Sequence, residues 1–184
     1  MPETLKATRF GNPILRSSAK RLTVEQIRSK PIQDLITNMR YTLQTKKYGV
    51  GIAAPQVGVD AALSVIGIKP TPNRPNLDPF DAVIINPEIT ETYGRKKQLW
   101  EGCISCGTGN NTLFAQVPRY KKIKLRWTDE KGKRHEDILE GFVAHVAQHE
   151  TDHLNGILFL DRVKDTTTYM MADEYRKRVL QKKS

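Results

Sequence analysis

Hydrophobic residues recur every three to four positions in the segment that follows Pro31. This spacing places them on one face of a helix, and proline suits the first turn, where its missing N–H is not needed. We therefore predict an amphipathic helix from Pro31 to about Lys46. Its apolar face consists of Ile32, Leu35, Ile36, Met39 and Leu43.

Two short apolar runs, Leu63–Ile68 and Ala82–Ile85, predict buried strands. The segment between them, residues 69–79, has prolines at positions 70, 72, 75 and 79. Proline cannot donate to a sheet ladder and it punctuates regular structure, so this segment is predicted to be a loop.

Apolar and basic side chains alternate over Tyr120–Trp127, which is typical of a half-exposed strand. Turn-forming residues follow at 129–132, so we predict a hairpin with Arg134–Leu139. A mostly apolar helix is predicted over 140–154 and should end at Asn155-Gly156. These elements predict an α+β fold in which this helix packs against antiparallel strands.

The chain has 30 Lys and Arg residues against 20 Asp and Glu residues, a formal net charge of +10. Basic residues gather in strand 120–127 and in a second predicted helix, residues 166–184. Such stripes attract phosphates without sequence preference. No recognised nucleic-acid module is present, so we expect no specific nucleic-acid partner.

No apolar run approaches the roughly 20 residues of a membrane span, and no secretory signal is apparent, so we expect no membrane partner. Two cysteines without a disulfide framework suit a reducing compartment. We therefore expect a bacterial-type cytoplasmic protein, or an organellar one only if a presequence has been removed. The length predicts a single catalytic domain, residues 1–184, with a basic C-terminal helix at about 166–184.

The candidate chemistry begins at the H-E-x-x-H pentad His149-Glu150-Thr151-Asp152-His153. Histidines four residues apart share one helix face and can bind one metal ion, while Glu150 can take a proton from a bound water. The alternative is a pair of solvated histidines beside an acid. The preceding apolar run argues against that alternative, because a buried helix needs partners for these polar groups. The pentad indicates metal-assisted hydrolysis of a substrate that it does not specify.

A catalytic site of this kind uses three protein ligands and keeps one position open. Phe159 stands where the metzincin pattern has its third histidine, which excludes that class. A metallopeptidase with a downstream glutamate ligand would use Glu174, although its basic neighbours are more typical of a solvated surface acid. The other source of a ligand is the cysteine pair, Cys103 and Cys106.

Cys103 and Cys106 form a C-x-x-C with three interpretations. A closed structural Cys₂His₂ site, as in a basic RNA-associated protein, would leave Glu150 without a role. A thioredoxin-like redox pair lacks the βαβ setting of that motif. A single thiolate from Cys103 beside the two histidines leaves a vacancy for water, and we favour this hypothesis.

Three blocks of the chain resemble the motifs of the peptide deformylase family, in the family's order. They are Gly49-Val50-Gly51-Ile52-Ala53-Ala54-Pro55-Gln56-Val57-Gly58, Glu101-Gly102-Cys103-Ile104-Ser105 and Gln148-His149-Glu150-Thr151-Asp152-His153-Leu154. Each block alone is moderately specific, and the three together are highly specific. The resemblance covers about Leu5 to Arg162 and implies antiparallel or mixed β-sheets packed around a central metal-binding helix.

The resemblance implies that Cys103, His149 and His153 bind one divalent metal ion. The ion is Fe²⁺ in many family members, and Zn²⁺, Ni²⁺ or Co²⁺ can substitute. Glu150 would deprotonate the attacking water and pass the proton to the leaving amine. The reaction would remove the formyl group from the N-terminal formylmethionine of nascent polypeptides and release formate.

The resemblance also implies that the Gln56 side chain and the backbone N–H of Ile104 stabilise the oxyanion that forms when the formyl carbon is attacked. Gly51 would let the substrate backbone approach closely, since it has no Cβ. His145 is interpreted as a pocket-wall or structural residue and not as a fourth ligand. The residues implied to contact substrate are Gly49, Val50, Gly51, Ile52, Phe142, His145 and Val146.

Two acids match family positions outside the ligand set: Glu101 near the metal, and Asp152, which would orient a ligand histidine. The segment 106–116 departs from the family as a longer, Gly- and Asn-rich loop. Cys106 within it is unusual and would make the site sensitive to oxidation. A deformylase meets nascent chains at the RNA-rich ribosome, so the basic C-terminal helix is a hypothetical ribosome contact.

Overall fold

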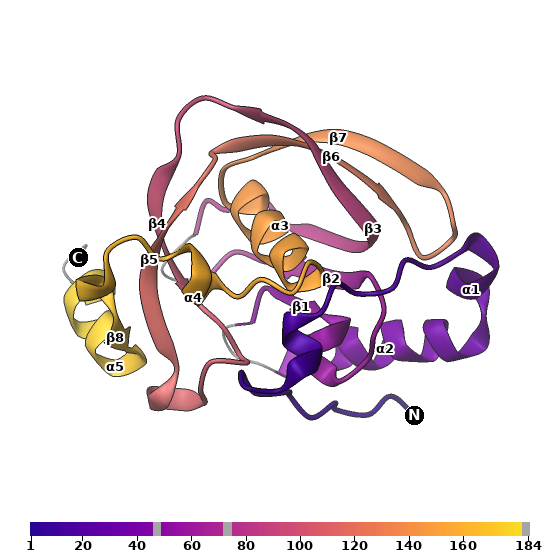
Figure 1. The fold of residues 1–184 in the computed structure, drawn as a ribbon, viewed down its shortest axis with the longest axis horizontal. Coiled ribbons are helices and arrows are strands. Elements are labelled where there is room, and N and C mark those ends of the chain that lie inside the picture. The colour runs from indigo at the N-terminus through magenta and orange to yellow at the C-terminus, as the bar shows by residue number, and fades with distance from the viewer. Residues whose placement is uncertain (46–48, 72–74, 182–184) are drawn as a thin grey trace.

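Two antiparallel sheets around a central helix form the frame of the protein in a computed structural model (Figure 1). The structure describes residues 1–45, 49–71 and 75–181. This architecture confirms the predicted α+β class. Among the described residues, no helix combines the length and the apolar character needed to cross a bilayer.

The larger sheet has five strands in the order β1-β2-β3-β6-β7, and each neighbouring pair is antiparallel. The strands β2, β6 and β7 lie where the hydrophobic pattern predicted them. β1 is too short for its burial pattern to be read from the sequence, and it forms one edge of the sheet. The bounds are β1 Gly51–Ala53, β2 Leu63–Ile68, β3 Phe80–Tyr93, β6 Lys122–Thr128 and β7 Arg134–Glu140.

β3 extends well beyond the predicted strand Ala82–Ile85. Asn86 has a φ of 51°, and the register against β6 shifts between Ile85 and Glu88. Beyond this irregularity the side chains are exposed or half-buried. The apolar-run criterion therefore identified the buried half of β3 and missed its outer half.

The smaller sheet joins β4 (Lys97–Gly102), β5 (Leu113–Arg119) and β8 (Met170–Met171) in the order β4-β5-β8. The loop predicted over 106–116 is shorter than expected: it ends at Thr112, and strand β5 begins at Leu113. Alternate residues of β5 point into the interior, so these seven residues are held by packing as well as by strand pairing.

The central helix, α3 (Gly141–Leu154), lies between the two sheets (Figure 1). It ends where predicted, with Gly156 at a φ of 71° packed closely against the backbone of Arg16. The cluster on this side of the larger sheet includes Ile66, Ile68, Ile84, Ile123, Leu125, Ala144, Val146 and Ala147.

The opposite face of the larger sheet is covered by α2 (Lys30–Thr45), whose Ile36, Met39 and Leu43 join the apolar cluster there. This confirms the predicted amphipathic helix, and its predicted last residue, Lys46, lies outside the described residues. The short α1 (Val24–Arg28) precedes it. Single 3₁₀ turns occupy Pro13–Arg16, Ala54–Val57 and Gly109–Asn111.

The predicted helix from Thr166 to the end is wrong in its first part. Asp165 accepts hydrogen bonds from the backbone and hydroxyl of Thr167, which produces a 3₁₀ turn over Thr166–Thr168. Strand β8 follows, and helix begins only at α5 (Ala172–Tyr175), continuing as a π-helical turn over Arg176–Leu180. Side-chain capping and edge pairing with β5 thus outweigh helix propensity here. The chain also forms α4 (Phe159–Arg162), which was not predicted.

Candidate metal centre

His149 and His153 lie one turn apart on α3 and aim their Nε2 atoms at the same point. These two atoms are 3.2 Å apart, and the ring planes are inclined at 81°. The i, i+4 spacing on a helix produces this arrangement directly. Burial of most of α3 then holds both rings inside the protein, His153 more completely than His149.

Cys103 brings the third candidate ligand from the loop that follows β4. Its Sγ is 3.3 Å from the Nε2 of His153, and the three ligand atoms all lie within 4.8 Å of one another. In the part of the chain that the structure describes, these three residues form the group suited to hold a metal ion. The fold thus brings together the three residues that the sequence analysis proposed as ligands.

The donor atoms fit a bound divalent ion. A tetrahedral ion with metal–nitrogen bonds of about 2.1 Å separates its nitrogens by roughly 3.4 Å, close to the spacing of the two imidazoles. One thiolate with two imidazoles is also a donor set that first-row metals accept. Three protein ligands leave one tetrahedral position open for water or substrate.

Glu101, at the end of β4, fixes the orientation of the histidines. Its carboxylate accepts hydrogen bonds from Nδ1 of His149 and Nε2 of His145, each 2.8 Å long. A proton on Nδ1 of His149 leaves Nε2 as the ligand atom. Burial raises the pKa of Glu101, but hydrogen bonds from His145, His149 and Arg119 outweigh it and hold that pKa well below its usual range. His145 is thus tied to the same carboxylate as His149.

Arg119 is a buried residue of the site whose role the sequence did not reveal. Its guanidinium donates to both Glu101 oxygens, at 2.7 and 3.1 Å, and to Asp152 at 2.5 Å. The alternation of β5 turns Ala115, Val117 and Arg119 inward. An arginine on the buried face of a strand was the signal that could have identified it, because buried charges need partners.

Asp152 does not have the role that the resemblance implied. Its carboxylate contacts Arg119 and Arg162 and not a ligand histidine. Within residues 1–45, 49–71 and 75–181, the Nδ1 atom of His153 has no hydrogen-bond partner. Asp152 therefore helps to position Arg119, which in turn binds Glu101.

Gln56 lies beside the cysteine sulfur. Its Oε1 accepts from the backbone N–H of Ala53 at 2.8 Å, which orients the amide so that Nε2 donates to Cys103 Sγ at 3.2 Å and to Ser105 Oγ at 3.4 Å. The S–H of Cys106 also donates to Cys103 and lowers the pKa of the Cys103 thiol. The charge of His153 lowers this pKa further, and together they outweigh burial, which raises it. These donors stabilise a thiolate at position 103.

Glu150 points from α3 toward the edge strand β1. A Cβ on Gly51 would lie 2.3 Å from Oε1 of Glu150, so only glycine allows this carboxylate its position. Burial raises the pKa of Glu150 to about 7, against the charges of His149 and His153, which lower it. A buried carboxylate with this pKa can accept and return a proton near neutral pH.

The residues implied to contact substrate lie on α3, on β1 and directly before β1. Val50, Phe142 and Val146 belong to the cluster between α3 and the larger sheet, and Ile52 to the cluster on the opposite face. The ring of Phe142 makes an edge-on contact with that of His145.

Two alternative ligand sets from the sequence are wrong. The carboxylate of Glu174 contacts Lys177 and Arg178, and in the described part of the chain Glu174 is not a member of the group suited to hold a metal ion. Cys106 donates to Cys103 and, in the described part of the chain, is not a member of the metal-ligand group. Its own thiol pKa is raised by that hydrogen bond and by burial.

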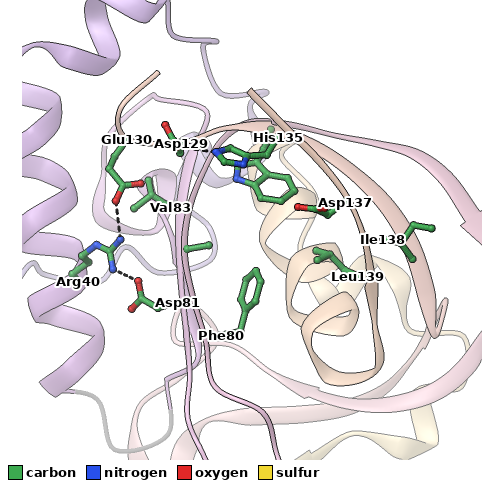
Figure 2. A pocket seen from close by; sticks show the side chains of 12 residues that line it. Arg40, Phe80, Asp81, Val83, Asp129, Glu130, His135, Asp137, Ile138 and Leu139 are labelled. Atoms are coloured by element: carbon green, nitrogen blue, oxygen red, sulfur yellow. Dashed lines mark hydrogen bonds and ion pairs between the residues drawn. The ribbon is translucent and has the colours of Figure 1, made fainter. Parts of the chain in front are cut away.

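A hollow of about 490 Å³ lies elsewhere, bounded by α2, β3 and the β6–β7 hairpin (Figure 2). Arg40 lies between Asp81 and Glu130 at its rim, and Trp127 stacks on His135. None of the three candidate ligand residues lines this hollow. The candidate metal centre is therefore identified by its side chains and not by the size of a cavity.

The sequence profile of the polypeptide deformylase family matches residues 4–169. The chain is 38% identical over 171 residues to the peptide deformylase of Leptospira biflexa, covering 89% of this chain and 90% of the relative. It is 37% identical over 179 residues to peptide deformylase 2 of a Nostoc species, covering 97% and 96%.

Solved structures agree with the sequence relatives. The Met-Ala-Ser-bound class I type b peptide deformylase of Acinetobacter baumannii matches with a TM-score of 0.81 and 32% identity, covering 89% of this chain and all of that one. A peptide deformylase from Synechococcus elongatus in complex with actinonin matches with a TM-score of 0.72 and 32% identity. That match covers 97% of this chain and 88% of the other.

Proposed function

The chain belongs to the peptide deformylase family, and we propose that it hydrolyses the formyl group from the N-terminal formylmethionine of nascent polypeptides, releasing formate. The observation that carries this proposal is the convergence of Cys103, His149 and His153 beside the carboxylate of Glu150. Three ligands and an adjacent base are the components that metal-assisted amide hydrolysis requires.

We propose that Cys103, His149 and His153 hold one divalent ion. Fe²⁺ is the proposed ion in the cell, and Zn²⁺, Ni²⁺ and Co²⁺ are proposed substitutes because this donor set accepts several first-row metals. The bound ion supplies Lewis acidity, which polarises a carbonyl and acidifies water. Glu101 supports this role, since a carboxylate that fixes a ligand imidazole raises its basicity.

Glu150 is the proposed base. It takes the proton of the attacking water and later delivers it to the departing amine of methionine, so that the peptide leaves with a free N-terminus. Its raised pKa suits both steps, because the protonated and ionised forms are then close in free energy. The glycine at position 51 leaves the space that the carboxylate occupies.

Gln56 and Ile104 are the proposed oxyanion donors. The amide of Gln56 is fixed by Ala53 and lies within hydrogen-bonding distance of the Cys103 sulfur, so it adjoins the ligand set. Ile104 follows Cys103 directly, and its carbonyl accepts from Arg9, which anchors the loop. Donors fixed before the reaction stabilise a developing negative charge without reorganisation.

The substrate is proposed to bind along the free edge of β1. An extended peptide can add to a sheet edge through main-chain hydrogen bonds, and β1 is such an edge next to Glu150. The methionine side chain would then contact apolar residues of β1, its preceding loop and α3. The proposed contacts are Gly49, Val50, Gly51, Ile52, Phe142, His145 and Val146.

We also propose that the chain works in the cytoplasm and contacts the ribosome through its basic C-terminal segment. Arg176 contacts Asn110, while Lys177 and Arg178 contact Glu174. These contacts order the segment along the protein surface. Exposed basic side chains are attracted to RNA phosphates at low ionic strength.

The direct test is an anaerobic assay of formyl-Met-Ala-Ser with metal analysis of the same preparation. The account predicts release of formate and a free methionine amine by protein that carries about one ion per chain. Protein that is fully loaded with metal and folded, yet releases no formate from this peptide, would contradict the proposed function.

A further inference from the structure

Cys103 and Cys106 are held by a tight turn. The backbone N–H of Cys106 donates to the carbonyl of Cys103 at 2.9 Å. A turn of this kind brings its first and fourth Cα atoms within about 7 Å, and disulfides span roughly 4.4–6.8 Å between Cα atoms. Both thiols are free and buried, and one hydrogen-bonds to the other.

The N-terminal segment fixes this turn from outside. Arg9 donates to the carbonyls of Ile104 and Gly107, at 3.2 and 2.6 Å, and the N–H of Phe10 donates to the carbonyl of Ser105 at 3.0 Å. The loop is thus held on both sides of Cys106 by contacts that do not involve the metal ligands. These contacts hold the turn that brings the two sulfurs together.

Cys106 has no role in the proposed hydrolysis. It packs in an apolar cluster with Ala115, Val117 and Phe159, where valine or alanine would also fill space. Free cysteine often serves as a small apolar residue. Cys106 differs from such a residue in one respect, because its sulfur contacts the sulfur of a proposed metal ligand.

We propose that Cys103 and Cys106 form a site of reversible oxidation, at which a peroxide converts the two thiols into an intramolecular disulfide. The disulfide withdraws Cys103 from the metal-ligand set, and the protein releases its ion. Reduction restores the ligand. The inference rests on the proposed function only in taking Cys103 as a metal ligand.

The oxidation balances with hydrogen peroxide as the oxidant. The thiolate of Cys103 attacks one peroxide oxygen, the O–O bond breaks, and Cys103 becomes a sulfenic acid with release of hydroxide. The sulfur of Cys106 then attacks the Cys103 sulfur, the S–O bond breaks, and water leaves with the thiol proton. Two sulfurs lose two electrons in total, and peroxide gains them.

The thiol of Cys106 determines whether oxidation of Cys103 can be reversed. A sulfenic acid without a nearby thiol is oxidised further to sulfinic and sulfonic acids, which ordinary thiols do not reduce. Capture by Cys106 stops the oxidation at the disulfide, which a dithiol reverses by exchange. The side chain of His149 is 13% exposed, so a molecule as small as peroxide can approach the ligand set.

The test uses zinc-loaded protein, because zinc has no redox chemistry of its own. Wild type, Cys106→Ser and Cys106→Val are treated with hydrogen peroxide. Released zinc, free thiols and intact mass are measured before and after dithiothreitol. The serine variant retains a polar group of similar size, and the valine variant fills the apolar cluster, so at least one should retain the fold. Equal initial zinc binding and an unchanged circular dichroism spectrum establish this.

Wild type should release its zinc, lose both thiols and lose two hydrogen atoms in mass, and dithiothreitol should restore its zinc binding. Both variants should gain oxygen atoms and remain unable to rebind zinc after reduction. The proposal is overturned if wild type gains oxygen without forming the disulfide, or if the variants recover as fully as wild type. Formate release by untreated protein is scored separately, so failure here is distinct from failure of the proposed hydrolysis.

Discussion

Oε2 of Glu101 lies 2.8 Å from Nδ1 of His149, and this contact joins strand β4 to the face of α3 that carries both candidate histidine ligands. The hydrogen bond fixes the ring so that Nε2 faces His153 and Cys103. Since Glu101 is itself held by Arg119, the ligand geometry depends on residues from three different elements.

Replacing Glu101 with glutamine should weaken metal binding. The amide is neutral and cannot accept from two histidines and an arginine as the carboxylate does, so we expect a loss of affinity of about 10- to 100-fold. Competition with a zinc chelator measures this loss. Glu25→Gln, on the exposed start of α1, is the matched control and should bind as wild type. Equal affinity of the Glu101 and Glu25 variants would refute the role of Glu101.

Replacing Arg119 with methionine should destabilise the fold. The change leaves the buried carboxylates of Glu101 and Asp152 without their shared cation, and breaking such a pair costs about 3–5 kcal/mol. Urea unfolding measures the free energy. Arg162→Met removes a cation from the same Asp152, but that side chain is 40% exposed, so the expected loss is below about 1 kcal/mol. Similar losses in both variants would argue against a special role for Arg119.

Replacing Gly51 with alanine should slow turnover while the metal remains bound. The new Cβ would overlap Oε1 of Glu150 and force the carboxylate to move. Displacing a general base costs on the order of 10²-fold in rate. Gly67→Ala is the control, because its Cβ meets the flexible side chain of Leu43 at 3.2 Å and an oxygen of the exposed Asp81 side chain at 4.0 Å. The idea fails if kcat on formyl-Met-Ala-Ser is unchanged in Gly51→Ala.

Replacing Glu150 with glutamine should retain the metal and lose activity, because the amide cannot take a proton from water. A loss of about 10²- to 10⁴-fold in kcat is expected. Metal content and kcat must be measured on one preparation. A variant that turns over normally with its ion bound would show that another group is the base.

Deleting residues 176–184 should weaken co-sedimentation with ribosomes at low salt. The deletion removes basic side chains and leaves Tyr175, which stacks on Phe114, makes a tilted contact with Trp100 and holds the preceding turn. Activity on short formylated peptides should be spared. Salt should weaken the wild-type interaction, since phosphate contacts are screened. Unchanged sedimentation of the truncated chain would contradict this ribosome contact.

The convergence of the three candidate ligands could be predicted in part, from helix geometry and from the family motifs. The i, i+4 spacing of His149 and His153 places both rings on one helix face, and the family motifs singled out Cys103. The edge strand β1 could not be predicted from periodicity, since three residues carry too little pattern. The first part of the C-terminal segment was mispredicted because Asp165 caps a turn and Met170–Met171 pair with β5.

The resemblance placed Glu101 near the metal, but the sequence could not predict the contacts that join Glu101, Arg119 and Asp152. Glu101, Arg119 and Asp152 come from β4, β5 and α3, and only the packing of these elements brings them together. The resemblance implied that Asp152 orients a ligand histidine, and the nearest one along the chain is His153. On a helix, neighbouring residues point in different directions, so Asp152 faces Arg119 and Arg162 instead.

The central claim is that one sulfur and two imidazoles bind the ion and leave a position open. X-ray absorption at the zinc edge of loaded protein tests it most directly. The account predicts one sulfur at about 2.3 Å and three lighter donors at about 2.0–2.1 Å, unchanged in Cys106→Ser and lacking sulfur in Cys103→Ala. Two sulfurs in the wild-type spectrum, or a sulfur that persists in Cys103→Ala, would contradict it.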